Sequence, residues 1–415
     1  MTCTMESNAK RFKRAPLVAA IGAAMGLIAA GAVHAEVVVG NQAGWELSFD
    51  GSVNAFLVTE NPDATPANVN GGTISDDQSS SRIRTGLLPA VFAFNVRTPT
   101  TNGLKGAARF GFYPQIQNAN TKNAFGSQLD LRQAYFTVDG NFGQVMAGRN
   151  ISLFLGKNIL TDMTLFGVGV EGGVSGGGTT LGRIGYGYVY PQFNAQIRYT
   201  TPDMNGFKLA VGAFDPSQIA SAGVAATQTK TPRFEGELSW VTNPNPNNKI
   251  EAWVNGMTQK ADFTPGSGFS GSVTANGVGG GVQWTINNWS LLASGYTGKA
   301  LGTTLMLDTD SLDPTGKERD DKGYLAQVTF NPIPSTKIGV SYGLSQADET
   351  SAEQAIRLGG GVAQLNKQKS TTVGVYHDIN SWLKVVAEYT TAKNEWFNGA
   401  SQKTNIVSVG TFFSF

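Results

Sequence analysis

Few side chains in this sequence could act in catalysis or bind a metal ion. The 415 residues include 2 histidines and 1 cysteine, and Cys3 stands close to the amino terminus. His377, flanked by Tyr376 and Asp378, is the one imidazole beyond residue 35. A hydrolase needs a nucleophile and a base within reach of each other, and a lone histidine at a strand end is more often an interface residue. We therefore predict that the protein is not an enzyme.

Two motifs resemble ligand-binding sites, but the residues around them do not support either site. The G-x-G-x-x-G pattern at 167–172 indicates a dinucleotide site only within a βαβ unit, and no such unit surrounds it. The D-x-D-x-x-D run at 308–313 resembles the start of a calcium loop, but Asp313 occupies the place of the required glycine and Arg319 that of the final glutamate. The sequence therefore predicts no cofactor and no metal site.

The composition excludes several classes of protein. Lysine and arginine number 31 against 30 aspartates and glutamates, whereas a nucleic-acid-binding face normally gives a clear basic excess. Charged residues make up 15% of the chain, well below the roughly 25% of soluble domains. Hydrophobic residues make up 40%, but beyond residue 45 no apolar run is long enough to cross a bilayer as a helix. Neither a nucleic-acid partner nor a bundle of membrane helices is expected.

The first 35 residues have the pattern of a secretory signal peptide. Four basic residues between 10 and 14 precede an apolar stretch at 17–33. Val33 and Ala35 take the −3 and −1 positions of a cleavage site. The alternative is an uncleaved anchor helix, although a membrane span needs roughly 20 apolar residues. We predict cleavage of 1–35 before Glu36, which leaves 36–415 as a single domain without a cysteine.

Beyond residue 45 the chain alternates apolar and polar residues in short segments. One such stripe runs from Trp45 to Leu57 and another from Val407 to Phe415. Alternation with a period of two is the signal of a β-strand whose two faces differ. We predict sixteen strands, at 45–58, 82–98, 103–116, 127–139, 142–151, 184–201, 206–214, 231–242, 249–260, 273–286, 288–299, 321–331, 335–347, 367–379, 382–395 and 403–415.

The predicted connections alternate in length. Every second one is a short turn, such as Asp139–Asn141, and the others are long and polar, including 59–81, 152–183 and 300–320. A β-barrel of the outer membrane has short periplasmic turns, long outer loops and an even number of strands. Because backbone groups in lipid must all be paired, the first strand has to close the sheet against the last. The expected fold is all-β, a transmembrane antiparallel up-and-down β-barrel.

Side chains on the predicted strands sort into two faces. Charged residues that alternate with apolar ones are expected in a wet lumen, because a charge facing lipid costs several kcal/mol at the bilayer midplane; they are Lys105, Arg109, Glu235, Glu237, Glu251, Lys337, Lys384 and Glu388. Aromatic rings collect at membrane interfaces. Four tryptophans near short turns therefore predict a periplasmic girdle, with packing against a neighbouring subunit as the alternative; they are Trp240, Trp284, Trp289 and Trp382.

Several stretches of the chain resemble the general diffusion porins of Gram-negative bacteria. They are RQAYFTVDGNFGQVMAGRN at 132–150, TDM at 161–163, LGR at 181–183 and the terminal VGTFFSF. Phe415, with Phe413 two residues before it, is similar to the signal that the barrel-assembly machinery reads in this family. The resemblance covers essentially all of the chain after residue 35.

The resemblance implies a homotrimer of 16-stranded barrels in which the third outer loop, about 152–183, folds into the lumen. Basic wall residues and acidic loop residues would face each other across this constriction, at Arg149, Arg183, Arg82, Arg84, Asp162 and Glu171, beside the lumen-facing Arg109 and Lys105. The family's acidic Pro-Glu-Phe reads Thr-Leu-Phe at 164–166. Arg149 is in phase with lipid-facing residues, so Gly148 would have to permit a bulge that turns it inward. A rim position, or contact with lipopolysaccharide phosphate, is the alternative for each arginine.

The expected function follows from the pore. A sixteen-stranded barrel leaves an aqueous channel, through which small hydrophilic solutes and ions would diffuse across the outer membrane, with a weak preference for anions set by the narrowest ring. The alternative is a substrate-specific channel, whose binding site could use Phe154, Phe166, Tyr186, Tyr188 and Tyr190. Outer-membrane lipid, lipopolysaccharide and the barrel-assembly machinery are the expected partners.

Overall fold

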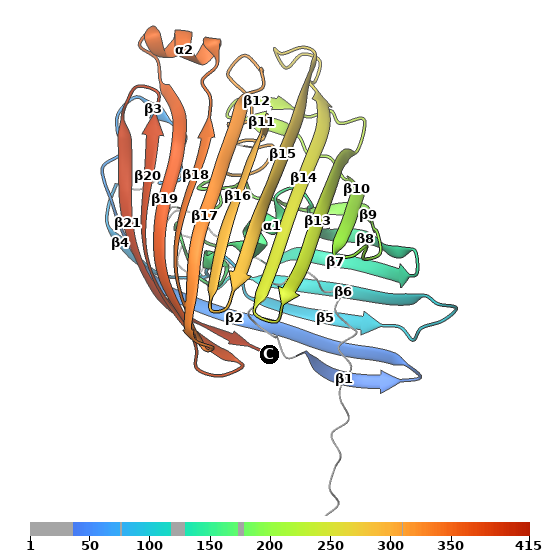
Figure 1. Cartoon of the computed structure of the whole chain (residues 1–415). Helices are drawn as coiled ribbons and strands as arrows, with labels where there is room; N and C mark the ends of the chain where they lie inside the picture. The colour runs from blue at the N-terminus through green and yellow to red at the C-terminus, as the bar shows by residue number, and fades with distance from the viewer. Residues whose placement is uncertain (1–35, 75–76, 118–128, 173–177, 309) are drawn as a thin grey trace, which may run out of the picture.

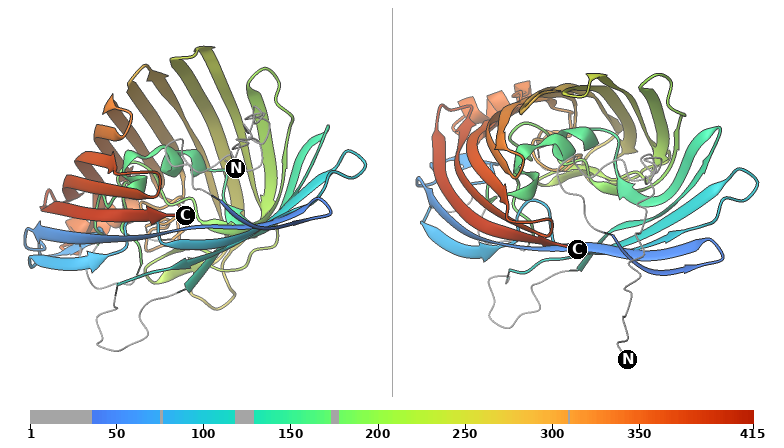
Figure 2. Two further views of the ribbon diagram at one scale, coloured as in Figure 1. Left: turned by 90° about the horizontal axis from the view of Figure 1, so that it is seen from below. Right: turned by 60° about the horizontal axis from the view of Figure 1, so that its bottom comes forward.

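The chain forms a closed antiparallel β-barrel around a central lumen (Figures 1 and 2). The computed structural model describes residues 36–74, 77–117, 129–172, 178–308 and 310–415. The predicted signal peptide lies outside these ranges. Within them, no helix is long and apolar enough to cross a membrane.

The wall begins with β2 and ends with β21, which pair from Ser52 opposite Ser414 to Pro62 opposite Thr404. This pairing closes the sheet, as the need to pair every backbone group in lipid requires. In chain order the elements are β1 (Val37–Gln42), β2 (Trp45–Pro62), β3 (Val69–Asn70), β4 (Ser80–Arg84), β5 (Val91–Arg97), β6 (Lys105–Pro114), β7 (Leu129–Gly140), β8 (Gly143–Ile151), α1 (Gly156–Thr161), η1 (Met163–Phe166), β9 (Phe193–Thr200), β10 (Phe207–Phe214), β11 (Ile219–Ser221), β12 (Val224–Ala226), β13 (Arg233–Asn245), β14 (Asn248–Asp262), β15 (Ser272–Ile286), β16 (Trp289–Lys299), β17 (Asp320–Ile333), β18 (Thr336–Ala347), α2 (Ser351–Leu358), β19 (Ala363–Asp378), β20 (Leu383–Trp396) and β21 (Ser401–Ser414).

The wall has sixteen strand positions, which confirms the predicted number. β4 and β5 pair with successive stretches of β2 and together hold one position. β3 makes a short parallel pairing with the outer end of β19, and β11 and β12 form a separate hairpin. β1 was not predicted; it turns back at Ala43 and Gly44 to pair with the first residues of β2.

The two faces of the strands differ as the sequence predicts. On β17, Tyr324 is 48% exposed on the outer face and its neighbour Leu325 is 1% exposed on the inner face. Strand connections at one end are short turns, whereas α2, β11 and β12 lie in the long connections at the other end (Figure 1). By the porin-like loop pattern, the long connections belong to the outer mouth.

The second strand position is interrupted where the wall approaches the lumen. Between β4 and β5, the backbone N–H groups of Leu87 and Leu88 donate to the carbonyls of Gly167 and Leu165, at 2.9 and 3.2 Å. Over 85–90 the wall therefore lacks strand-to-strand pairing, and its backbone instead forms hydrogen bonds with a segment inside the barrel.

One predicted strand begins too early. The sequence predicts a strand over 184–201, but β9 starts at Phe193. The alternation of glycine and tyrosine over 185–188 is responsible, since it has the period of a strand. In the structure Gly185 and Gly187 take φ values of 77° and 151°, and the segment continues the connection from β8 inside the barrel.

Candidate functional site

The connection from β8 to β9, residues 152–192, is named here the inserted loop; its described residues, 152–172 and 178–192, lie inside the barrel (Figure 2). Backbone N–H groups at three places along the loop donate to lumen-facing side chains, with N···O distances of 2.8 to 2.9 Å. The acceptors are Glu235 on β13, Gln327 on β17 and Glu388 on β20. Glu235 and Glu388 thus face inward as predicted, and they hold the loop against the wall.

Asp162 stands between the two short helices of the inserted loop. One carboxylate oxygen accepts from the backbone N–H of Thr164 at 2.8 Å and so caps η1. The other accepts from the Tyr188 hydroxyl at 2.7 Å. Because Asp162 is 4% exposed, its charge acts within the loop and does not face a wall arginine across water.

Glu171 connects the inserted loop to the second strand position. Its carboxylate forms an ion pair with the Arg84 guanidinium, and the two side chains are 2% and 4% exposed. Arg84 also donates to the carbonyl of Gly178 at 3.3 Å. The structure therefore brings together two of the residues predicted for the constriction, as a buried pair that fixes the loop.

Arg183 lies in the inserted loop as predicted, but its side chain is fully buried. It donates to the carbonyl and hydroxyl of Ser341 on β18 and to the Ser370 hydroxyl on β19. No carboxylate of the described residues lies within ion-pair distance of it. Arg183 therefore fastens the loop to the wall and does not line an open passage.

The placement of Arg149 contradicts the prediction that it faces the constriction. Arg149 is exposed and pairs in register with Ala195, which is in phase with the 65% exposed, outward-facing Ile197. Gly148 does take a φ of 122°, but the alternation of faces continues through it. Arg149 donates to the carbonyl of Phe193 at 2.8 Å, on the outer face near the outer end of β8.

Lys105, Arg109 and Arg82 face inward, as strand alternation predicts. Arg109 donates two hydrogen bonds to the carboxylate of Asp50, at 2.6 and 2.9 Å, and is 9% exposed. Lys105 lies in register with Asp139 near the short turn. Arg82 is half-buried on the same face of β4 as Arg84. These basic side chains lie along the wall from the short-turn end to the outer end, and the charge of Arg109 is paired with that of Asp50.

Arg198 on β9 is a lumen-facing residue that the sequence analysis missed. Its neighbours Ile197 and Tyr199 are 65% and 37% exposed on the outer face, and Arg198 is 9% exposed on the inner face. Its guanidinium contacts the sulfur of Met146 at 3.2 Å. No carboxylate in the described part of the chain lies within 4.0 Å of it. Strand alternation over 193–200 could have found this residue.

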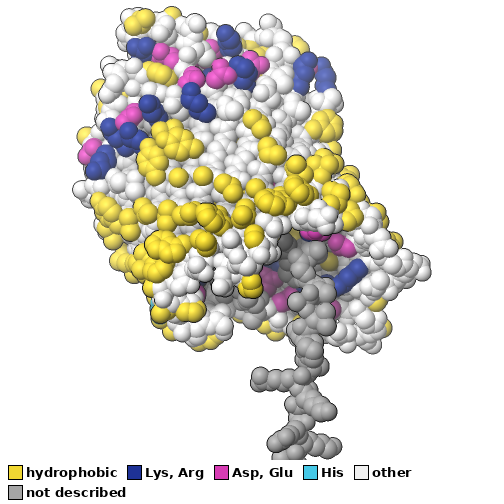
Figure 3. Space-filling model, viewed as in Figure 1, with side chains coloured by type: hydrophobic (Ala, Val, Ile, Leu, Met, Phe, Trp, Pro, Cys, Tyr) yellow, Lys and Arg dark blue, Asp and Glu magenta, His cyan; other side chains and the backbone are white. Residues whose placement is uncertain are grey.

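The outer face carries an apolar band with charged side chains above it (Figure 3). Of the four tryptophans predicted to form a girdle, Trp240, Trp284 and Trp289 lie on outward strand positions beside short turns, and Trp382 lies in the short turn before β20. Three of them contact another aromatic ring, with centroid separations of 5.7 Å for Trp240 and Phe207, 4.4 Å for Trp289 and Phe330, and 5.4 Å for Trp382 and Phe413. Trp284 is 40% exposed.

The three residues considered for hydrolysis do not come together. His377 lies on the outer face, where its Nδ1 is 2.8 Å from the Thr336 hydroxyl. Tyr376 and Asp378 point to the lumen, where they bind Glu388 and Lys384. Among the described residues, no group of three or more histidines, cysteines or acids is arranged to hold a metal ion.

Comparison with solved structures finds the same fold in outer-membrane channels. The channel DcaP of Acinetobacter baumannii matches with a TM-score of 0.67 at 16% identity, over 91% of this chain and 100% of that chain. An anion-selective porin from Comamonas acidovorans matches with a TM-score of 0.62 at 15% identity, over 89% and 100%. A trimer form of OmpT from Vibrio cholerae matches with a TM-score of 0.51 at 14% identity, over 89% and 99%.

The family comparison covers most of the chain. No curated protein matches the sequence significantly, but the model of the Gram-negative porin family matches residues 18–396. The match includes the inserted loop and every wall strand except the last. The chain belongs to the Gram-negative porins, the channel-forming barrels of the outer membrane.

Proposed function

We propose that the chain forms a water-filled channel through which small hydrophilic solutes and ions diffuse passively across the outer membrane. The observation that carries this proposal is water access inside the closed wall. Gln133 and Tyr135 on β7, and Lys157 and Thr161 on the inserted loop, lie inside the barrel and keep partial solvent exposure. A lumen filled by side chains would bury them. Solutes in such a channel follow their own gradients and need no energy source.

A weak preference for anions is part of the proposal. Arg198 and Lys337 face the lumen with no carboxylate within 4.0 Å among the described residues. By contrast, Glu235, Glu388 and Asp162 already accept hydrogen bonds from the inserted loop. These two positive charges are not neutralised by an ion pair among the described residues, and the charge of the lining sets selectivity.

The substrate-specific alternative receives less support from the described residues. Of the five aromatic residues that could form a binding surface, Phe154, Tyr186 and Tyr188 are fully buried and Phe166 is 7% exposed. Only Tyr190 of these five is half-buried. Packed rings stiffen the inserted loop, but they cannot stack on a passing solute.

Recording in planar bilayers tests the channel. The purified protein should give stable conductance steps, and a salt gradient should give a reversal potential of the sign expected for anion preference. Absence of conductance from a folded, heat-resistant barrel would overturn the proposal. Clear cation selectivity would overturn the anion preference alone, and block by one solute at micromolar concentration would favour the substrate-specific channel.

We further propose that the protein assembles as a homotrimer, supported by the match to a trimer form among the structural neighbours. Chemical cross-linking of the detergent-solubilised protein should yield a ladder that ends at three subunits. Conductance should then close in three equal steps. A ladder that ends at one or two subunits would contradict the trimer while leaving the channel intact.

Lipopolysaccharide is the proposed lipid partner, through three lysines at the outer end of the wall. Lys369, Lys393 and Lys403 lie directly opposite one another on the outer faces of β19, β20 and β21. Glu395 pairs with Lys369 and Lys393 at 2.8 and 2.9 Å, so the row keeps a net positive charge. Like charges opposite each other repel, and a bound phosphate would relieve this repulsion.

The remaining proposals concern export and assembly. Residues 1–35 would be removed by signal peptidase, so that 36–415 form the mature single domain; the amino-terminal residue of the purified protein, expected to be Glu36, tests this. Phe413 and Phe415 at the end of β21 would be read by the barrel-assembly machinery. The four tryptophans beside the short turns would anchor the periplasmic interface.

A further inference from the structure

A second segment besides the inserted loop lies inside the outer half of the barrel. Residues 300–308, named here the outer segment, follow β16 and rest on the end of the inserted loop. The backbone N–H of Tyr190 donates to the carbonyl of Thr304 at 2.9 Å, and the Gln192 amide donates to the carbonyl of Met306 at 2.6 Å. The Gln368 amide, from the lumen face of β19, reaches the Thr304 hydroxyl at 3.2 Å. The outer segment therefore extends along the inner side of the wall from β16 towards β19.

Most residues of the outer segment are buried. Leu301, Met306 and Leu307 are at most 1% exposed and belong to the same apolar cluster as the inserted loop. The hairpin of β11 and β12 adds a hydrogen bond from the Ala220 N–H to the Leu307 carbonyl, at 2.9 Å. Burial of apolar side chains stabilises this position by roughly 25 cal/mol per Å² removed from water. The segment is therefore a fixed part of the lumen.

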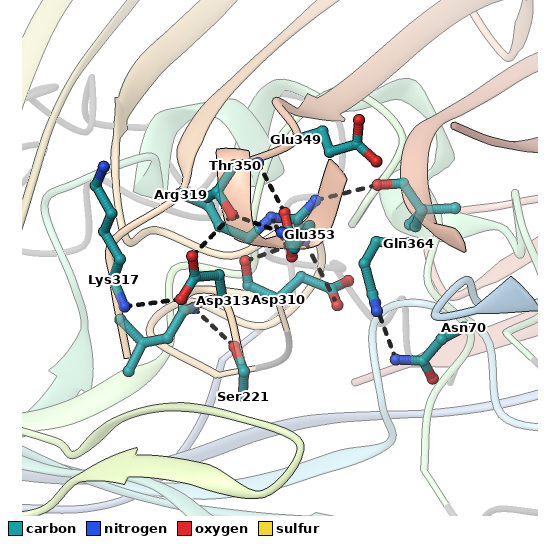
Figure 4. Close-up of polar contacts among 12 residues, drawn as sticks. Asn70, Ser221, Asp310, Asp313, Lys317, Arg319, Glu349, Thr350, Glu353 and Gln364 are labelled. Carbon is teal, nitrogen blue, oxygen red and sulfur yellow. Dashed lines mark hydrogen bonds and ion pairs between the residues drawn. The ribbon is translucent and has the colours of Figure 1, made fainter. Parts of the chain in front are cut away.

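A cluster of charged residues holds the end of this connection (Figure 4). Arg319, 1% exposed, lies between Glu353 of α2, at 3.4 Å, and Asp310, at 3.8 Å. It also donates to the carbonyl of Leu365 on β19 at 3.2 Å. Burial raises the pKa of the Glu353 carboxyl, and Arg319 opposes that rise. The cluster joins the connection after β16 to the one after β18.

Leu305 is an apolar residue of the outer segment that stays exposed, as does the charged Asp308 at the end of the segment. It forms a parallel bridge with Tyr190, inside the barrel, and yet it is 41% exposed. Since its backbone partner belongs to the inserted loop, this exposed surface lies inside the wall and not on its lipid-facing side. Tyr190 is half-buried beside it.

We propose that the outer segment is a second size filter of the channel, in series with the α1 and η1 part of the inserted loop, and that Leu305 and Tyr190, the latter from the end of that loop, form its edge. This inference rests on the proposed function as a diffusion channel. The edge carries no formal charge, so it would select solutes by size, whereas charge selection would remain with the wall arginines below it. Two constrictions in series both limit flux, so narrowing either one lowers permeation of the largest solutes first.

Cysteine labelling tests the position of Leu305. The mature chain should contain no cysteine, because Cys3 is the only one in the sequence and precedes residue 36. A methanethiosulfonate reagent should react with Leu305→Cys in open channels, forming a mixed disulfide as the sulfinate leaves, and lower the conductance by about a third. The matched control is Leu358→Cys, 74% exposed on α2, where labelling should leave the conductance unchanged.

A bulky substitution tests size selection directly. In proteoliposomes, Leu305→Trp should slow the entry of a trisaccharide about threefold while changing that of a pentose by less than about 1.5-fold; Leu358→Trp should change neither. If labelled Leu305→Cys and Leu305→Trp both behave like the unmodified protein in a conducting barrel, the second filter is wrong. If the unmodified protein does not conduct, the proposed function itself fails.

Discussion

Gly51 and Phe415 exchange two backbone hydrogen bonds at the seam of the barrel. The N–H of each residue donates to the carbonyl of the other at 2.9 Å. A Cβ atom on residue 51 would lie 2.6 Å from the Phe415 ring, so the absence of a side chain at Gly51 makes room for the terminal ring. The last residue of the chain therefore takes part in closing the wall.

Gly51→Leu should destabilise the closed barrel by about 1–3 kcal/mol, because the new side chain overlaps the Phe415 ring. The temperature at which the protein changes mobility in electrophoresis without boiling measures this loss. Gly40→Leu is the matched control, since nothing lies within 4 Å of a Cβ there. Equal unfolding temperatures for the two variants would contradict this account of the seam.

Deletion of Phe415 should slow assembly more than it lowers the stability of barrels already formed. The deletion removes the terminal ring that we propose the assembly machinery reads, as well as two hydrogen bonds of the seam. The fraction of protein in the membrane after pulse labelling measures assembly. Normal accumulation of the shortened chain would show that recognition does not depend on Phe415.

Glu171→Gln should loosen the inserted loop. The substitution removes one charge of a buried ion pair, and breaking such a pair typically costs about 3–5 kcal/mol. We expect noisier single-channel currents and faster entry of large sugars. Restoring a neutral pair with Arg84→Met in the same chain should recover part of the stability. Unchanged current noise in Glu171→Gln would rule out an anchoring role for this pair.

Arg198→Gln should reduce the preference for anions, because it removes a lumen-facing charge that has no carboxylate within 4.0 Å in the described part of the chain. Arg149→Gln, which removes the same charge from the outer face, should leave the reversal potential unchanged. Reversal potentials in a tenfold salt gradient compare the two variants. A larger shift for Arg149→Gln would restore the original assignment of Arg149 to the constriction.

Substitution of Lys369, Lys393 and Lys403 together by glutamine should lower the amount of lipopolysaccharide that copurifies with the protein. The phosphate contacts would be lost, while the wall pairing would remain. The control is the joint substitution of Lys230, Lys260 and Lys299 by glutamine. It removes the same charge from positions that do not lie opposite one another in the sheet. Mass spectrometry of the bound lipid measures both. An equal loss in both variants would indicate a general charge effect.

Much of the wall could be predicted from the sequence because two physical constraints act on it. Lipid on one side and water on the other impose an alternation such as that of Tyr324 and Leu325, and the need to pair backbone groups in lipid imposes closure. Both constraints act on each strand locally. The strand number and the joining of the first to the last therefore follow without knowledge of any tertiary contact.

The interior of the lumen could not be predicted in the same way. Tyr186 and Tyr188 alternate with glycines as strand residues do, but they are buried by contacts with distant strands. Leu301 and Met306 belong to short apolar stretches in a largely polar connection, and only the assembled barrel provides the surface that buries them. The resemblance to the porin motif placed Arg149 at the constriction, whereas the alternation of strand faces placed it on the outer face. The alternation was correct.

The break in the second strand position has a consequence for how such a channel can evolve. Over 85–90 the wall holds the inserted loop through main-chain groups, at Leu87 with Gly167 and Leu88 with Leu165. Contacts of this kind tolerate exchange of side chains at either partner. Mutations can therefore alter the side chains that line the channel, and with them the range of solutes that enter the cell. The inserted loop meanwhile stays at the same depth in the barrel.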